Sequence, residues 1–253
     1  MAHPTKPASV PPARRRRWRG WTIGLLSVFG LLLGLGLYMH DLAQPHPERY
    51  ATGVVTEGAA LEAMTARPLA RRYLSDFHTQ TSGASCGPAS LRNVLVSLGH
   101  PVGSEEELFE GDQAGWWRMR LMGMTLDAVA ALAERHGLGW VQILRDLSLD
   151  AFRDRLRTLD TPGRRLIVNY SRAPINGVSL GHFSPLGGYD PVSDRVLVLD
   201  VTPGFGVQLI PAALLHAAMQ TRDPVSGRSR GLIQIDAGAT DSAPSARNRM
   251  PPE

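Results

Sequence analysis

The sequence contains a single cysteine, Cys86, in a setting that favours a nucleophile. The apolar residues after it recur at helical spacing as far as Leu98, and Gly99 and Pro101 end the pattern, so Cys86 is predicted in or just before the first turn of a helix. Unpaired N–H groups and the positive end of the helix dipole stabilise a thiolate at that position. Gln80, a short loop upstream, could donate its amide to an oxyanion formed when the sulfur attacks a carbonyl.

A histidine and an aspartate that could assist this thiol lie far downstream. Residues 181–189 and 195–201 have the character of two strands joined by a turn, and they carry His182 and Asp200. Paired as a hairpin, the strands could place the two side chains together. Cysteine, histidine and aspartate occur here in the order used by papain-like enzymes, in which the base takes the thiol proton and the carboxylate fixes its tautomer.

Several motifs in the same order resemble those of the phytochelatin synthase family. They are Gln80 to Leu98, Met124 to Asp127, Val168 to Arg172, His182 to Pro185, Leu199 to Val201, and Asp223 followed by Arg230 and Gly231. The resemblance covers roughly residues 69–235. It implies an α+β fold of the papain-like, two-lobed cysteine peptidase type, with a helical lobe first and an antiparallel β lobe second.

The resemblance also implies an activity on glutathione. Cys86 would attack the carbonyl of the Cys–Gly bond, glycine would leave, and the acyl-enzyme would pass γ-glutamylcysteine to water or to a second glutathione, which yields phytochelatin. The family pattern assigns the γ-glutamyl head to Asp223 and Arg230. It assigns the rest of the pocket to Asn169, Arg172 and Gly181. Without the resemblance, Asp223 and Arg230 would be interpreted as a surface ion pair.

The sequence departs from the family after Asp200. Residues 202–207 replace a basic and aromatic stretch, and the cysteine-rich C-terminal region of plant members is absent. This pattern resembles a shortened bacterial form that acts mainly as a hydrolase. Because no cysteine or histidine cluster has metal-ligand spacing, no built-in metal cofactor is expected. Cadmium or zinc would enter as a thiolate complex of the substrate.

Two other functions are compatible with the same residues. One is a membrane-anchored papain-like cysteine peptidase that acts on a peptide or protein. The other is a non-enzymatic interaction module on a decayed papain-like fold. Decay usually removes a catalytic group, whereas Cys86, His182, Asp200 and Gln80 are all present. The oligomeric state stays open between a monomer and a homodimer.

The charge of the chain is concentrated at its start. Residues 1–40 hold six basic residues and no acidic one, which more than accounts for the net charge of +4 and leaves −2 for the remainder. The basic balance is therefore local, and no nucleic-acid partner is expected.

An apolar run over residues 21–39 follows five arginines. As a helix it would be about 28 Å long, close to the thickness of a bilayer core. The flanking charge predicts residues 1–20 in the cytoplasm and the catalytic domain in the periplasm of a bacterium, behind a single transmembrane helix of the inner membrane. A cleaved signal peptide that releases the domain into the periplasm is the alternative.

The remaining boundaries follow from composition. Residues 40–60 contain prolines and are expected to form a tether, residues 61–236 the catalytic domain, and residues 237–253 a disordered tail. With 43% hydrophobic and 20% charged residues, the chain has the composition of one globular domain with appendages.

Overall fold

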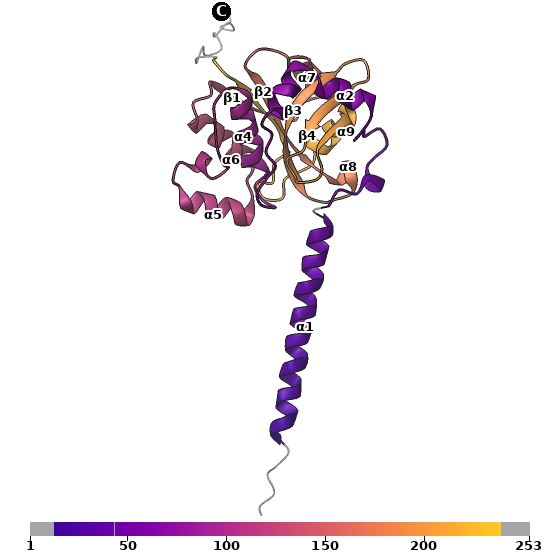
Figure 1. Cartoon of the computed structure of the whole chain (residues 1–253), viewed down its shortest axis with the longest axis vertical. Coiled ribbons are helices and arrows are strands. Elements are labelled where there is room, and N and C mark those ends of the chain that lie inside the picture. Colours follow the sequence, from indigo (N-terminus) through magenta and orange to yellow (C-terminus); the bar gives the residue numbers. More distant parts are fainter. Residues whose placement is uncertain (1–12, 43, 239–253) are drawn as a thin grey trace, which may run out of the picture. The chain divides into compact units, whose positions relative to one another are not determined.

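The computed structural model describes residues 13–42 and 44–238. The chain divides into two units, of which the first ends at Gln44 and the second begins at Pro45. The first contains helix α1, Ala13–Leu42 (Figure 1). Among the described residues, no helix is both long enough and apolar enough to cross a membrane, so the transmembrane helix expected over residues 21–39 is not found there. Residues 1–12 and 239–253, which include most of the expected tail, lie outside the described residues.

The second unit is built on one antiparallel sheet of six strands, which confirms the expected α+β class. The strand order is β1-β6-β2-β3-β4-β5, and every neighbouring pair is antiparallel. The strands are β1 (Trp140–Arg145), β2 (Arg164–Ser171), β3 (Gly181–Asp190), β4 (Arg195–Leu199), β5 (Val207–Pro211) and β6 (Gly231–Asp236). Interior residues of β2 and β3 are buried without alternation, so both faces of the central sheet are covered.

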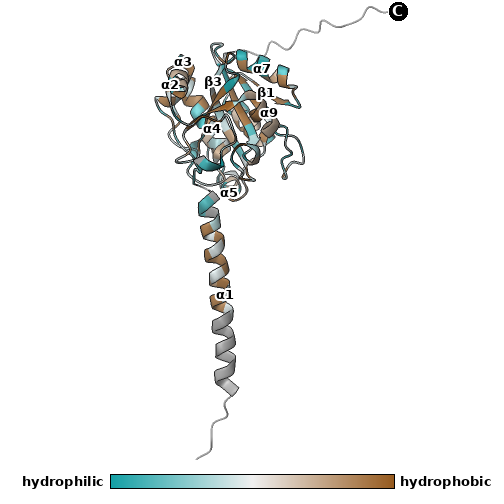
Figure 2. Ribbon diagram, turned by 90° about the vertical axis from the view of Figure 1, so that its right-hand side faces the viewer, coloured by the Kyte–Doolittle hydropathy of each residue, from teal (hydrophilic) through white to brown (hydrophobic). Residues whose placement is uncertain are grey.

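Helices cover this sheet. They are α2 (Ala59–Thr65), α3 (Pro68–Leu74), α4 (Cys86–Ser97), α5 (Gln113–Met122), α6 (Leu126–Arg135), α7 (Leu149–Arg157), α8 (Ala173–Asn176) and α9 (Ala212–Met219), with short 3-10 turns at Pro47–Arg49 and Glu107–Phe109. Helix α4 packs on β3 and α6 on β1, while α9 contacts β2 and β5. Figure 1 shows α4, α5 and α6 at one side of the unit and β4 with α9 at the other. Within the second unit, the buried hydrophobic residues lie on the sheet and its covering helices, and Figure 2 shows hydrophobic residues along α1 as well.

The segment expected as a tether is partly incorporated into the second unit. The backbone N–H of Ala51 donates to the carbonyl of Ile175 at 2.7 Å, and Val55 forms a β-bridge with Leu209 beside β5. Since these contacts extend the sheet edge, the unit that carries the site begins near Pro45 and not at residue 61.

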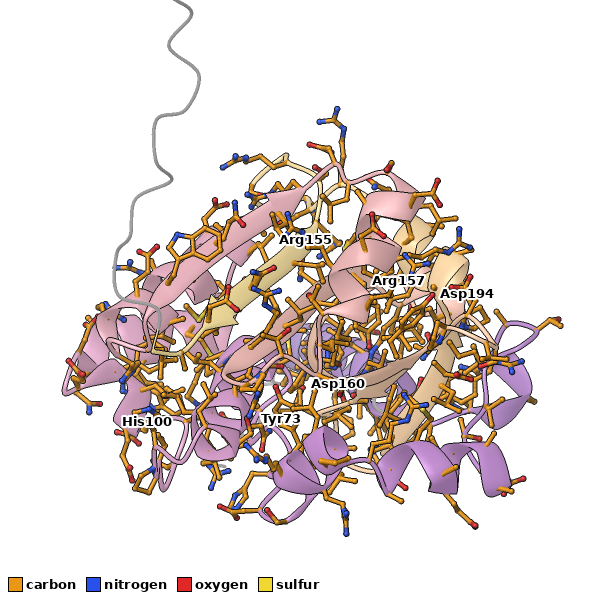
Figure 3. All side chains as sticks on the ribbon, turned by 90° about the horizontal axis from the view of Figure 1, so that it is seen from above. Tyr73, His100, Arg155, Arg157, Asp160 and Asp194 are labelled. Atoms are coloured by element: carbon orange, nitrogen blue, oxygen red, sulfur yellow. The ribbon has the colours of Figure 1, made fainter. Side chains whose placement is uncertain are left out.

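Strand β3 is shared between two partners, which a simple hairpin would not predict. Its first half pairs with β2 and its second half with β4, and the register shifts between Leu186 and Gly188. His182 and Asp200 therefore both lie beyond the residues that pair β3 with β4. The turn that joins these strands is held from outside, because Arg153 of α7 donates to Asp194 at 2.6 Å, and Arg157 lies close to the same carboxylate (Figure 3).

Candidate active site

Cys86 is the first residue of α4, as the apolar spacing predicts, and its side chain is half-buried. The next residue, Gly87, leaves room for α6, because a Cβ there would stand 2.7 Å from Val129. Burial alone would raise the pKa of the Cys86 thiol. A hydrogen bond and positive charge from His182, a hydrogen bond with the Phe183 backbone and the charge of Arg172 together lower that pKa below its ordinary value.

His182 and Asp200 form a buried pair at the same point. Nε2 of His182 donates to Oδ1 of Asp200 at 3.0 Å, and the two residues are 4% and 2% exposed. Since Asp200 engages Nε2, Nδ1 is the ring nitrogen left for the Cys86 thiol. Burial and the charge of Arg172 lower the pKa of His182, but Asp200 and Cys86 outweigh them and the net pKa is raised. This arrangement favours a thiolate facing an imidazolium.

Asp200 is held on several sides. Nη2 of Arg172 donates to its two carboxylate oxygens at 2.7 and 2.6 Å, and the backbone N–H of Thr202 donates to Oδ1 at 2.8 Å. The Arg172 guanidinium also lies over the ring of Phe205, 4.3 Å from its centroid. Burial would raise the pKa of Asp200, but the charges of His182 and Arg172 and these hydrogen bonds hold it well below its usual range.

Arg172 therefore has different partners from those expected of a pocket residue. It is 5% exposed, and its guanidinium is directed at Asp200 and at the hydroxyl of Thr202, 2.6 Å away. In this geometry it positions the carboxylate that orients the histidine. Sequence spacing could not reveal this role, because Arg172 and Asp200 come from separate segments that meet only across the sheet.

The lowered thiol pKa has a measurable consequence. We expect iodoacetamide to alkylate Cys86 in the folded chain at pH values below about 8.5, the ordinary pKa of a cysteine. The thiolate is present above the lowered pKa and is lost as the pH falls through it. The urea-unfolded chain is the control. There Cys86 no longer lies beside His182, so its thiol should titrate with the ordinary pKa of a cysteine. Identical pH profiles for the folded and unfolded chains would contradict the thiolate–imidazolium assignment.

Gln80 is brought to this region by a hydrogen bond to the segment that directly follows Asp200. Its backbone N–H donates to the carbonyl of Val201 at 2.6 Å, and its side-chain amide donates to the carbonyl of Ser82 at 2.8 Å. One amide hydrogen is thus used within the loop, and the other remains for a substrate oxygen.

A buried carboxylate that the sequence did not reveal holds the same loop. Glu105 is 3% exposed and accepts hydrogen bonds from the backbone N–H and the hydroxyl of Thr81 at 2.8 and 2.7 Å. Its neighbours Glu106 and Glu107 are exposed. In the sequence the three acids form one run, so only the tertiary contact distinguishes Glu105.

Arg230 is the second charged feature of the region around Cys86. It is 7% exposed, Nη1 donates to Oδ1 of Asn169 at 3.3 Å, and its buried Nε has no hydrogen-bond partner. Its guanidinium occupies the space that a side chain at Gly181 would need. Burial lowers the pKa of Arg230, and the charges of Asp223 and Cys86 oppose that effect. A buried guanidinium with an unused donor is suited to an anionic group of a substrate.

Asp223 has a more local role than the resemblance implies. Its carboxylate accepts from the backbone N–H groups of Val225 and Ser226, both at 3.3 Å, and from the Ser226 hydroxyl at 2.8 Å. It therefore caps the turn that precedes Arg230. Among the ion pairs of the described residues, none joins Asp223 to Arg230. Within the same part of the chain, no three acidic, histidine or cysteine side chains are grouped so as to hold a metal ion.

The contact between Gly181 and Arg230 gives a second prediction. The Gly181→Ala variant is expected to displace the guanidinium and raise KM for a substrate with an anionic head by about ten- to hundredfold, with a smaller effect on kcat. In an Arg230→Ala background the same substitution should add little, because the clashing group is gone. Steady-state kinetics of the four proteins measures this coupling, and additive effects would refute it.

The family model and the similar sequences indicate one family. The family model described as phytochelatin synthase matches residues 57–232. The chain is 33% identical to glutathione gamma-glutamylcysteinyltransferase 3 of Lotus japonicus, over 65% of this chain and 36% of the relative. It is 33% identical to glutathione gamma-glutamylcysteinyltransferase 1 of Triticum aestivum, over 68% of this chain and 36% of the relative. A glutathione gamma-glutamylcysteinyltransferase of Schizosaccharomyces pombe is 27% identical, over 62% of this chain and 41% of the relative. The chain thus spans well under half the length of these relatives.

Two solved structures are distantly similar. The peptidase domain of Streptococcus ComA, a bifunctional ABC transporter, has a TM-score of 0.43 and 19% identity, over 63% of this chain and 96% of that domain. A double-glycine-motif protease from an AMS/PCAT transporter, in complex with its leader peptide, has a TM-score of 0.41 and 19% identity, over 63% and 89%.

Proposed function

Because the chain belongs to the phytochelatin synthase family, we propose that it is a glutathione γ-glutamylcysteinyltransferase whose acyl-enzyme forms on Cys86. One combination of groups in the second unit carries this proposal. It consists of a thiol with a lowered pKa, a buried His182–Asp200 pair and the Arg230 guanidinium, whose Nε has no hydrogen-bond partner. Helix α4 with the nucleophile packs on β3 with the base. That arrangement supports the finer assignment to a papain-like two-lobed fold.

The geometry supports the following sequence of steps. The thiol proton resides on His182, and the thiolate attacks the carbonyl carbon of the Cys–Gly amide. Gln80 stabilises the oxyanion of the tetrahedral intermediate. The imidazolium returns the proton to the glycine nitrogen, the C–N bond breaks, and γ-glutamylcysteine stays on Cys86 as a thioester. Water, or the α-amine of a second glutathione, then loses a proton to His182 and attacks the thioester, which regenerates the thiol.

Recognition of the donor is proposed at Arg230 and Asp223. The γ-glutamyl group carries a carboxylate and an ammonium, which have charges opposite to those of these two side chains. Arg230 offers its free Nε donor, and Asn169 fixes the guanidinium from the other side. Asp223 lies half-buried in the adjacent turn. There its carboxylate would contact the ammonium while it keeps the hydrogen bonds that cap the turn.

The acceptor is proposed to be chiefly water. Residues 202–207 contain no basic side chain and a single aromatic one, Phe205, where a basic and aromatic stretch is expected of a site for a second glutathione. Thr202 and Phe205 are instead engaged with Asp200 and Arg172. Cadmium or zinc would act as a thiolate complex of the substrate.

Mass spectrometry of glutathione incubated with the chain, with and without cadmium or zinc, tests this function. Free glycine with γ-glutamylcysteine is the expected result, and longer (γ-Glu-Cys) oligomers would show that glutathione also serves as the acceptor. If neither product forms while Cys86 still reacts with iodoacetamide, the proposal fails and a peptide or protein becomes the substrate to test.

A location at the bacterial inner membrane, with the second unit in the periplasm, remains a proposal from the apolar run over residues 21–39 and the arginines before it. Fractionation of cells that express the full chain or residues 45–253 tests it. Full-length chain in the carbonate-washed membrane fraction would support an anchor. A shortened chain in the periplasm would support signal cleavage, and full-length chain in the soluble fraction would refute both.

A further inference from the structure

Helix α5 has apolar side chains on both of its faces. Trp116 and Met119 face inward and are buried, with the Trp116 ring edge-on to Phe109 at 5.5 Å between centroids. On the outer face, Trp117 is 58% exposed and Leu121 is 81% exposed. The outer face of an ordinary surface helix is polar, so Trp117 and Leu121 depart from the usual pattern of a surface helix.

The charged side chains in the C-terminal half of α5 are all positive. Arg118 lies on the outward side, and the guanidinium of Arg120 lies over the rings of both Trp116 and Trp117, at 5.3 and 5.9 Å. Helix α5 itself contains no acidic residue. Asp112 is at the opposite end, where it caps the helix by accepting from Gly115 at 2.8 Å.

A second segment continues the same surface. Val225, at the tip of the turn capped by Asp223, is 71% exposed, and Met122 at the end of α5 is 74% exposed. Both line one groove of about 450 Å³ that also includes Met124 and whose charged lining residues are Arg118, Arg135 and Asp112. Figure 1 shows α5 at the edge of the second unit. Trp117 and Leu121 lie outside the groove lining, one turn apart on α5, and Leu121 precedes Met122 in the chain. We call Trp117, Leu121, Met122 and Val225 the apolar patch of α5.

We propose that this patch lies in the headgroup region of an anionic lipid bilayer. Tryptophan and arginine place an apolar body in the acyl boundary while the indole N–H and the guanidinium stay among headgroups and water. A helix that carries both, with leucine beside them, has the composition of interfacial helices that lie on membranes. A second copy of the chain is disfavoured as the occupant, because a two-fold contact through this face would bring the same arginines together.

A fluorescent probe on the full chain tests the contact locally. In a Cys86→Ala background, Leu121→Cys is labelled with an environment-sensitive maleimide dye and mixed with vesicles of phosphatidylcholine, with or without phosphatidylglycerol. The control is Val192→Cys in the same background, since Val192 is 94% exposed in the β3–β4 turn. We expect a blue shift and quenching by nitroxide-labelled lipid at position 121, larger with phosphatidylglycerol, and neither at position 192.

Two substitutions sharpen the result. Trp117→Ser should weaken the vesicle-dependent shift at position 121, whereas Trp140→Ser on β1, which removes a tryptophan of 37% exposure, should leave it unchanged. The proposal is overturned if positions 121 and 192 respond alike to vesicles. It is also overturned if the shift at position 121 grows with protein concentration in the absence of lipid, because the partner would then be a second copy.

Discussion

The Cys86→Ala variant is expected to lose turnover of glutathione by roughly ten-thousand-fold or more while it folds normally. The sulfur is the atom that forms the acyl-enzyme, and the histidine and aspartate beside it have no other nucleophile to activate. Within the described residues Cys86 is the single free cysteine, so no second thiol can take its place. Alanine suits the first turn of a helix and leaves the packing of Gly87 against α6 unchanged.

Ser90→Ala on the same helix is the matched control. Ser90 is fully buried, and its hydroxyl has no hydrogen-bond partner, so its removal should affect neither turnover nor folding. Glycine release and thermal unfolding of both variants measure the difference. A Cys86→Ala protein that still releases glycine at the parent rate would remove Cys86 from the mechanism.

The Arg172→Met variant is expected to lower the free energy of unfolding by about 3–5 kcal/mol and to remove most activity. Arg172 and Asp200 form a buried ion pair in which the two side chains are 6% and 2% exposed, so loss of the guanidinium leaves a buried carboxylate with fewer partners. Arg172 also lowers the pKa values of both Cys86 and His182. Without it both values rise, and the pH profile of Cys86 alkylation shifts toward alkaline pH.

Arg165→Met separates the structural effect from the electrostatic one. Arg165 is also a buried arginine, but it donates to the hydroxyl and carbonyl of Ser97, away from Cys86. Its loss should destabilise the fold without shifting the alkylation profile. The double variant Arg172→Met and Asp200→Asn should recover part of the stability, because the unpaired charge is gone, but not the activity. An unshifted profile in folded Arg172→Met would show that this arginine does not tune the thiol.

Several local elements were predictable because neighbouring residues determine them. The apolar spacing after Cys86 predicts α4, and α4 begins at that residue. Thr125 and Ser148 have the side-chain type that caps helices, and each side chain accepts from the backbone N–H three residues later, at 3.2 and 3.1 Å. Helix α5 and strand β1 were not predicted. Helix α5 lies between glycines, and β1 is completed only by pairing with β6, which is distant in the sequence.

The sequence by itself determined the kinds of groups in the site and the elements that carry them: a thiol at a helix start, a histidine on a strand, and a carboxylate after the next strand. The tertiary structure decided which charges neutralise one another. It turned Arg172 from an expected pocket residue into the partner of Asp200, made Asp223 a turn cap, and buried Glu105 against Thr81. The reason is physical: charge, spacing and helix signals are local, whereas burial and ion pairing depend on segments that become neighbours only when the sheet forms.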